Sequence, residues 1–200
     1  MKQIIRISSL YFVLLATATL FAQPRVWNAE TLLKSQSMLS EASKLVVQDA
    51  DKELRKQILT VVDKLMVPPS GDKHDYMSMG RYWWPNPDTN DGLPYVRRDG
   101  VSNPEIEKLD RYPLAQMTKS VKHLALAYHL TKDDKYAAKA TKNLRKWFLD
   151  KKTRMNPHLN YGQTVPGHNK GMGRGFGVID TYSFIEMLEG VELLKASKCF

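Results

Sequence analysis

The amino-acid sequence predicts an all-α protein built from antiparallel helical hairpins and two long loops. Apolar residues recur at helical spacing in several segments, whereas no segment of useful length alternates between apolar and polar residues as a half-buried strand does. Two stretches, 67–103 and 154–176, have no helical pattern. Loops this long in a compact helical domain are usually functional or disordered, and the aromatic residues of the first stretch argue against disorder.

The N-terminal residues have the layout of a secretory signal. Lys2 and Arg6 give a positive start, an apolar stretch runs from Leu10 to Phe21, and Ala22 offers a small residue for cleavage. The apolar stretch is short for a membrane span. We therefore expect residues 1–22 to be a cleavable signal peptide and 23–200 to be the mature domain. The protein is then periplasmic or secreted, with no membrane partner after cleavage.

Two helices are expected in the first part of the mature chain, over Glu30–Val47 and Asp51–Met66. The second has the cleaner apolar face, and Pro68 and Pro69 would end it because proline cannot continue a helix. The residues of that face are Leu54, Ile58, Val61, Val62 and Leu65.

Two further apolar stripes, Leu114–Tyr128 and Tyr136–Phe148, are separated by the polar turn TKDDK, in which Asp133 can cap the second helix. The last helix is expected over Val178–Ala196, with Asp180 as an N-cap or first-turn residue. These helices and two large loops do not close a symmetric helical barrel. We therefore expect the chain to be the first part of a longer domain.

The charge of the chain favours an anionic partner. The net charge is +9 at neutral pH, and only two of these charges belong to the signal residues Lys2 and Arg6. Polyanions such as acidic polysaccharides suit a basic protein, although a mildly basic charge without specific meaning is equally compatible with the sequence. Nucleic acid is disfavoured, because the protein is expected to be exported and has no dense run of Lys and Arg. Cys199 is the single cysteine and cannot form an internal disulfide.

The first long loop contains an aromatic and basic segment. Tryptophan faces stack on sugar rings, arginine binds carboxylates in two-point geometry, and asparagine can hydrogen-bond to hydroxyls. Adjacent residues rarely point the same way, so we expect one tryptophan of the pair inward and the other exposed. The alternative is that both wedge the loop against the helices. The candidate substrate-binding residues here are Arg81, Tyr82, Trp83, Trp84, Asn86 and Arg97.

The second long loop adds Gln163, His168 and Arg174 to the candidate binding residues, among glycines that allow close backbone approach. The glycine run lacks the preceding strand of a dinucleotide fingerprint and the Lys-Ser/Thr of a phosphate-binding P-loop. No helix carries paired histidines at metal-ligand spacing, so His158 and His168 are not expected to bind a metal. We expect no cofactor.

Three segments together resemble the alginate lyase superfamily domain of bacterial polysaccharide lyases: DYMSMGRYWWPNP, DGLPYVRRDGVSNPE and NYGQTVPGHNKGMGRGFGVIDT. The resemblance runs in order from about Asn28 to the end of the chain. It implies an (α/α) toroid, here an incomplete one, in which helical hairpins surround a cleft. It also implies metal-independent β-elimination on a uronic-acid polymer, in which a neutralised carboxylate acidifies the C5 proton and a Tyr or His removes it.

The resemblance places the segment Arg81–Asn86 in the lining of the substrate cleft, with Gln163, His168 and Arg174 near it. The family's catalytic Asn, His and Tyr are expected beyond Phe200, since this chain has no matching Asn-His pair. Three interpretations are therefore carried forward. The first is a polysaccharide lyase of alginate or a related polyuronate. The others are a non-catalytic periplasmic binding module for acidic polysaccharide and a helical scaffold with an aromatic-stapled loop.

Overall fold

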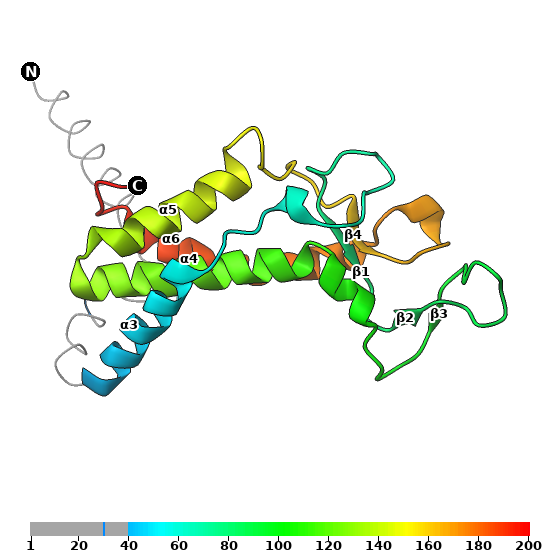
Figure 1. Cartoon of the computed structure of the whole chain (residues 1–200), viewed down its shortest axis with the longest axis horizontal. Coiled ribbons are helices and arrows are strands. Elements are labelled where there is room, and N and C mark those ends of the chain that lie inside the picture. The colour runs from blue at the N-terminus through cyan, green and yellow to red at the C-terminus, as the bar shows by residue number, and fades with distance from the viewer. Residues whose placement is uncertain (1–29, 31–39) are drawn as a thin grey trace, which may run out of the picture.

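The computed structural model describes residue 30 and residues 40–200, so the predicted signal peptide lies outside the described residues. The α-helices within residues 40–200 are α3 (Ser40–Arg55), α4 (Arg111–Thr131), α5 (Asp134–Phe148) and α6 (Phe184–Leu194). Figure 1 shows α3, α5 and α6 gathered at one end of the molecule, with the short strands and the long loops at the other. The long helix α4 connects the two ends.

Helix α4 is the centre of the hydrophobic core. It packs against α3, α5 and α6, and its buried residues recur at the three- and four-residue spacing of one helical face. Gly190 of α6 faces Ala125 of α4, where an added Cβ would lie 3.3 Å from the alanine Cβ. The buried residues of α4 include Leu114, Met117, Val121, Leu124 and Tyr128.

The hairpin of α4 and α5 was predicted from the sequence, and the structure confirms it. Lys132 ends α4 in the left-handed conformation, with φ of 58°. The side chain of Asp133 then accepts a hydrogen bond from the Lys135 N–H at 3.0 Å, which caps α5 as expected. The turn between the two helices is thus specified by local residues.

The predicted helix over Asp51–Met66 is wrong. Helix α3 ends at Arg55, and only a short 3₁₀ turn, Val61–Asp63, follows. The N–H and the hydroxyl of Thr60 both donate to the Asp63 carboxylate, at 2.7 and 2.8 Å, which closes this turn. The Leu59 carbonyl accepts from the buried Trp147 indole at 2.8 Å, so this segment binds α5 instead of continuing α3. The prolines at 68 and 69 are therefore not where the helix stops.

The all-α prediction is also wrong, because both long loops contain short strands. Strand β1 (Met77–Met79) pairs in parallel with β4 (Tyr161–Thr164), and β2 (Trp83–Trp84) pairs antiparallel with β3 (Val96–Arg97). Strands of this length are too short to show alternation in the sequence. Their hydrogen-bonding partners are also distant in the chain, particularly for β1 and β4.

The described helices do not show the toroid of helical hairpins that the resemblance implies, because α3, α5 and α6 pack around α4. The last helix is shorter than predicted. Residues Gly175–Thr181 form a 3₁₀ helix, and α6 begins only at Phe184.

A buried ion pair joins the helices to the strands. Lys64 Nζ lies 2.9 Å from a carboxylate oxygen of Asp110, and both side chains are fully buried. Asp110 directly precedes α4 and accepts from the Met77 N–H of β1 at 2.8 Å. Burial raises the pKa of Asp110 to about 6 and lowers the pKa of Lys64.

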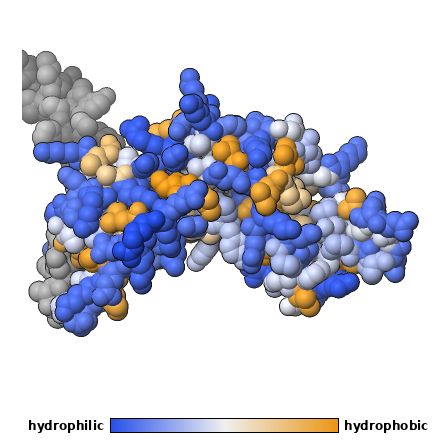
Figure 2. Space-filling view, in the orientation of Figure 1, coloured by the Kyte–Doolittle hydropathy of each residue, from blue (hydrophilic) through white to orange (hydrophobic). Residues whose placement is uncertain are grey.

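On the face shown in Figure 2, hydrophilic residues predominate, with smaller hydrophobic patches between them. Within residue 30 and residues 40–200, no helix has both the length and the apolar character needed to cross a membrane.

Candidate functional site

The two long loops of the sequence meet beside the parallel strands. The Gly80 N–H, just after β1, donates to the Thr164 carbonyl of β4 at 2.9 Å. The Tyr95 N–H donates to the Pro166 carbonyl at 3.0 Å, and Nε2 of His168 lies 2.9 Å from the Tyr95 carbonyl. The aromatic–basic segment and the glycine-rich segment therefore share one surface.

Trp83, His168 and Arg174 form a cluster on this surface, here called the Trp83 cluster. The Trp83 and His168 rings meet edge to face, with centroids 5.1 Å apart and planes at 63°. The Arg174 guanidinium carbon lies 5.9 Å from the Trp83 ring centre and 5.9 Å from that of Phe176. An aromatic ring beside a fixed guanidinium can stack on a sugar while pairing with a carboxylate.

Gly80 makes room for the Trp83 cluster. A Cβ at this position would lie 2.6 Å from Cδ1 of Trp83 and 2.7 Å from Nη2 of Arg174. Any larger residue would therefore push both side chains from their places. The sequence SMGRYWW has glycine at the one position where the backbone must approach the indole and the guanidinium.

A buried hydrogen-bond network lies behind the cluster and is centred on Asp180. One carboxylate oxygen of Asp180 accepts from the Tyr76 hydroxyl at 3.0 Å and from the Ser78 hydroxyl. The other accepts from the Gln163 amide at 2.9 Å and lies 3.6 Å from Nε of Arg111. Burial, followed by the Asp180 charge, raises the pKa of Tyr76, so its hydroxyl stays protonated as a donor.

Of the candidate residues, Gln163 has its side chain turned into this network and its backbone carbonyl turned to Arg174. The carbonyl accepts from Nε of Arg174 at 2.8 Å. Gln163 therefore supports the cluster from behind, and its amide is committed to Asp180 instead of facing a ligand.

The other candidates have different partners. Both tryptophans are half-buried, so the expected split into one inward and one exposed ring is not seen. The Trp84 indole donates to the Val101 carbonyl at 2.8 Å, with Arg98 5.6 Å from the ring centre. Arg97 pairs with Asp99 at 2.7 Å.

The side chain of Asn86 accepts from the Asp88 N–H at 3.0 Å and shapes a turn. Arg81 and Tyr82 are exposed. Their carbonyls accept from the N–H groups of Asn103 and Arg98, each at 2.8 Å, which ties the two sides of the loop together.

A second polar group surrounds Asp75. One oxygen of its buried carboxylate lies 3.0 Å from Nε2 of His158 and 2.6 Å from the Asn156 amide, and the other accepts from Ser70 at 2.7 Å. These contacts tie the chain before β1 to the segment before β4. Within residue 30 and residues 40–200, no group of three His, Cys, Asp or Glu side chains is placed to hold a metal ion.

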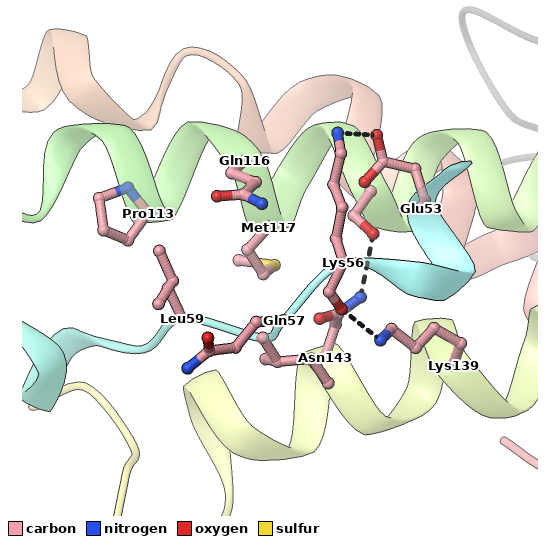
Figure 3. A pocket seen from close by; sticks show the side chains of 11 residues that line it. Glu53, Lys56, Gln57, Leu59, Pro113, Gln116, Met117, Lys139 and Asn143 are labelled. Atoms are coloured by element: carbon pink, nitrogen blue, oxygen red, sulfur yellow. Dashed lines mark hydrogen bonds and ion pairs between the residues drawn. The ribbon is translucent and has the colours of Figure 1, made fainter. Parts of the chain in front are cut away.

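Figure 3 shows a separate pocket between α3, α4 and α5, lined by Glu53, Lys56, Gln116 and Asn143 among others. Its volume of about 10 Å³ has room for about one water molecule. The Lys56 amine is already paired with Glu53 at 2.7 Å, and the Lys56 carbonyl accepts from Lys139 at 2.7 Å. This pocket cannot hold a sugar residue.

Sequence reasoning missed the network behind the cluster. Asp180 was predicted to cap the last helix, but it lies in the 3₁₀ helix before α6 and its carboxylate is buried. One feature of the sequence could have indicated a buried carboxylate: Asp180 is a lone acidic residue that follows the apolar residues of GVID, next to the glycine-rich second loop. Tyr76 and Ser78 gave no signal of their own.

Comparison with known proteins identifies the family. The family model described as alginate lyase matches residues 60–200. The crystal structure of an alginate lyase from Bacteroides ovatus superposes with a TM-score of 0.84 and is 54% identical, covering 88% of this chain and 48% of that one. The chain thus spans about half the length of that protein. No curated protein matches. The family model matches most of this chain, and the Bacteroides ovatus lyase is 54% identical to it in an alignment that covers 88% of this chain. The chain therefore belongs to the alginate lyase family.

Proposed function

We propose that this chain supplies substrate-binding surface to a polysaccharide lyase that acts on alginate or a related polyuronate. The observation that carries the proposal is the Trp83 cluster, in which Arg174 and His168 flank a half-buried indole. An indole face can stack on a pyranose ring, and a guanidinium held at its edge can pair with the carboxylate of that sugar. The net charge, +9 for the whole sequence and +7 without Lys2 and Arg6 (9 − 2), favours the same anionic polymer.

The proposed reaction of the whole protein is β-elimination without a metal. A base removes the C5 proton of a uronate, the C4–O4 bond breaks, a C4=C5 double bond forms, and the leaving oxygen takes up a proton. Positive or hydrogen-bonding groups at the carboxylate stabilise the charge that develops next to C5. Arg174, already fixed through Nε, would supply such a group to a uronate stacked on Trp83.

We assign binding to this chain and place the proton-transfer groups elsewhere in the whole protein. The family resemblance puts the Asn, His and Tyr that act on the C5 proton beyond Phe200. This chain covers only 48% of the Bacteroides ovatus lyase, which leaves room for them in a longer protein of that kind. Export is part of the same proposal, because residues 1–22 have the pattern of a signal peptide.

Affinity electrophoresis or calorimetry with alginate and with a neutral glucan tests the binding proposal. We expect the purified chain to bind alginate but not the glucan, with an affinity that falls as salt rises. Arg174→Gln should weaken binding about tenfold, since a charge-assisted contact is lost. Arg55→Gln removes the same charge from an exposed helix end and should bind like the unmodified chain. Equal affinity of the Arg174 variant and the unmodified chain would contradict the assignment.

Spectroscopic detection of the unsaturated uronate product tests the division of roles. We expect the purified chain to bind alginate without releasing product. Product release by this chain alone would show that it contains its own proton-abstracting base. A full-length protein that binds but never forms product would favour the alternative of a non-catalytic binding module.

A further inference from the structure

We infer that Asp180 is a positioning residue, which holds Arg174 against Trp83 by fixing the backbone of Gln163. The inference deepens the proposed function, because it names the group that orders the binding cluster. It rests on four links between buried or half-buried groups, which run from Asp180 to the surface.

The first link is the buried, hydrogen-bonded carboxylate of Asp180. Its side chain is completely buried, and donors from Tyr76, Ser78 and Gln163 surround it, with Arg111 3.6 Å away. Three of the roughly four acceptor positions of an ionised carboxylate are therefore filled by hydrogen bonds, and the Arg111 charge lies close by. Tyr76 and Ser78 lie just before β1 and within it, Gln163 lies in β4, and Arg111 begins α4, so Asp180 joins three segments that are distant in sequence.

The second link is the backbone of Gln163, which has φ of 55°. This left-handed conformation is sterically disfavoured for a non-glycine residue. It occurs where the register of β1 and β4 is irregular: Met77 pairs with Tyr161, but Met79 pairs with Thr164. Gln163 thus lies in a bulge, a device that redirects backbone groups beside functional sites.

The third link is the set of bonds that hold this bulge. The Gln163 N–H donates to the Ser78 hydroxyl at 2.7 Å, and the Ser78 hydroxyl in turn donates to Asp180. The Gln163 amide donates to the other Asp180 oxygen at 2.9 Å. Both ends of Gln163 are therefore anchored to a single carboxylate, directly or through one hydroxyl.

The fourth link leads to the surface. With its backbone turned in this way, Gln163 directs its carbonyl to Nε of Arg174 at 2.8 Å. The guanidinium then lies 5.9 Å from the ring centre of Trp83. Without Asp180, the Gln163 amide and the Ser78 hydroxyl lose their shared acceptor, so the disfavoured backbone conformation is held less firmly and the acceptor of Arg174 is no longer fixed.

The experiment labels the chain with 5-fluorotryptophan and follows the ¹⁹F signals, assigned by single Trp→Phe replacements. Arg174→Gln defines the signal of Trp83 without its guanidinium neighbour. Asp180→Asn should shift the Trp83 signal toward that position and leave the buried Trp147 signal unchanged. This readout needs no polysaccharide, so a failure of the proposed function leaves it intact. The matched control is Asp75→Asn, which removes another buried carboxylate beside β1 and should not move the Trp83 signal.

Rescue separates positioning from a general loss of structure. Gln163→Gly adopts positive φ without strain, so the double variant Asp180→Asn/Gln163→Gly should return the Trp83 signal toward its original position. In alginate binding, Asp180→Asn and Arg174→Gln should each lose about tenfold, and Asp180→Asn/Arg174→Gln should lose no more than either single variant.

An unchanged Trp83 signal in folded Asp180→Asn would overturn the inference, as would additive losses in binding. If Asp180→Asn does not fold, Gln163→Met decides the matter, because it removes the amide donor and keeps the carboxylate with its other partners. That variant should shift the Trp83 signal in the direction of Arg174→Gln, and no shift would overturn the inference.

Discussion

Trp83 and Trp84 allow a matched test of the binding surface, because they are adjacent, both half-buried and each close to one arginine. Trp83→Ala loses an edge-to-face contact with His168, worth about 0.5–1.5 kcal/mol, and a cation–π contact with Arg174, worth about 0.5–1 kcal/mol. Trp84→Ala loses a similar contact with Arg98 and one hydrogen bond to Val101, worth about 0.5–1.5 kcal/mol. Each replacement should therefore lower the free energy of unfolding by about 1–2.5 kcal/mol.

The two variants should differ in polysaccharide binding. Loss of an aromatic platform costs about 1–3 kcal/mol where bases stack on proteins, so Trp83→Ala should weaken alginate binding roughly 5- to 150-fold by analogy. Trp84→Ala should keep the original affinity, because Trp84 is not part of the Trp83 cluster and its indole N–H is already bonded to the Val101 carbonyl.

Urea unfolding followed by circular dichroism gives the stability of each variant, and calorimetry with alginate gives the affinity. Both measurements are made below the unfolding transition of the weaker variant. Equal losses of stability with unchanged affinity in both variants would show that Trp83 and Trp84 only pack the loop against the rest of the fold. Equal losses of affinity would show that the ring of Trp84 also contacts the polymer, contrary to the assignment.

Three further predictions concern the packing that supports the site. Gly80→Ala should weaken alginate binding and shift the Trp83 fluorine signal, whereas Gly175→Ala, with nothing within 4 Å of its added Cβ, should do neither. Lys64→Met should lower the free energy of unfolding by about 3–5 kcal/mol in urea titrations, because it leaves the Asp110 charge buried without its cationic partner, and Lys64→Met/Asp110→Asn should lose clearly less. Burial raises the pKa of Asp110 from 3.8 to about 6, so its contribution to stability is complete below the lower value and is lost as pH rises through the higher one. Unfolding at pH 5 should thus require about 1 kcal/mol more than at pH 7.5 on account of this group, and that gain should be absent from the double variant.

The sequence alone predicted those helices and turns that depend on residues close together in the chain. The α4–α5 hairpin follows from two apolar stripes and the cap at Asp133. Each of these signals relates residues that are only two to four positions apart. The segment with Trp83 and Arg81 was identified by composition, and the family by three motifs that the comparisons confirm. In contrast, the apolar spacing of residues 51–66 favours a continuous helix, but Thr60 and Asp63 form a hydrogen-bonded turn there instead. The spacing of apolar residues does not show which of the two structures is more stable.

Only the tertiary structure decided which chemical groups meet at the site. The Gln163 N–H bonds to Ser78 across 85 residues of chain, and Tyr76 reaches Asp180 across 104. No pattern of period two or 3.6 encodes contacts at such separations, and strands of two to four residues leave no alternation to find. The left-handed Gln163, the buried Asp180 and the contact of Arg174 with Trp83 all depend on the parallel pairing of β1 with β4. That pairing forms only when the helices packed on α4 bring the two loops together, because a short parallel strand pair is not stable alone.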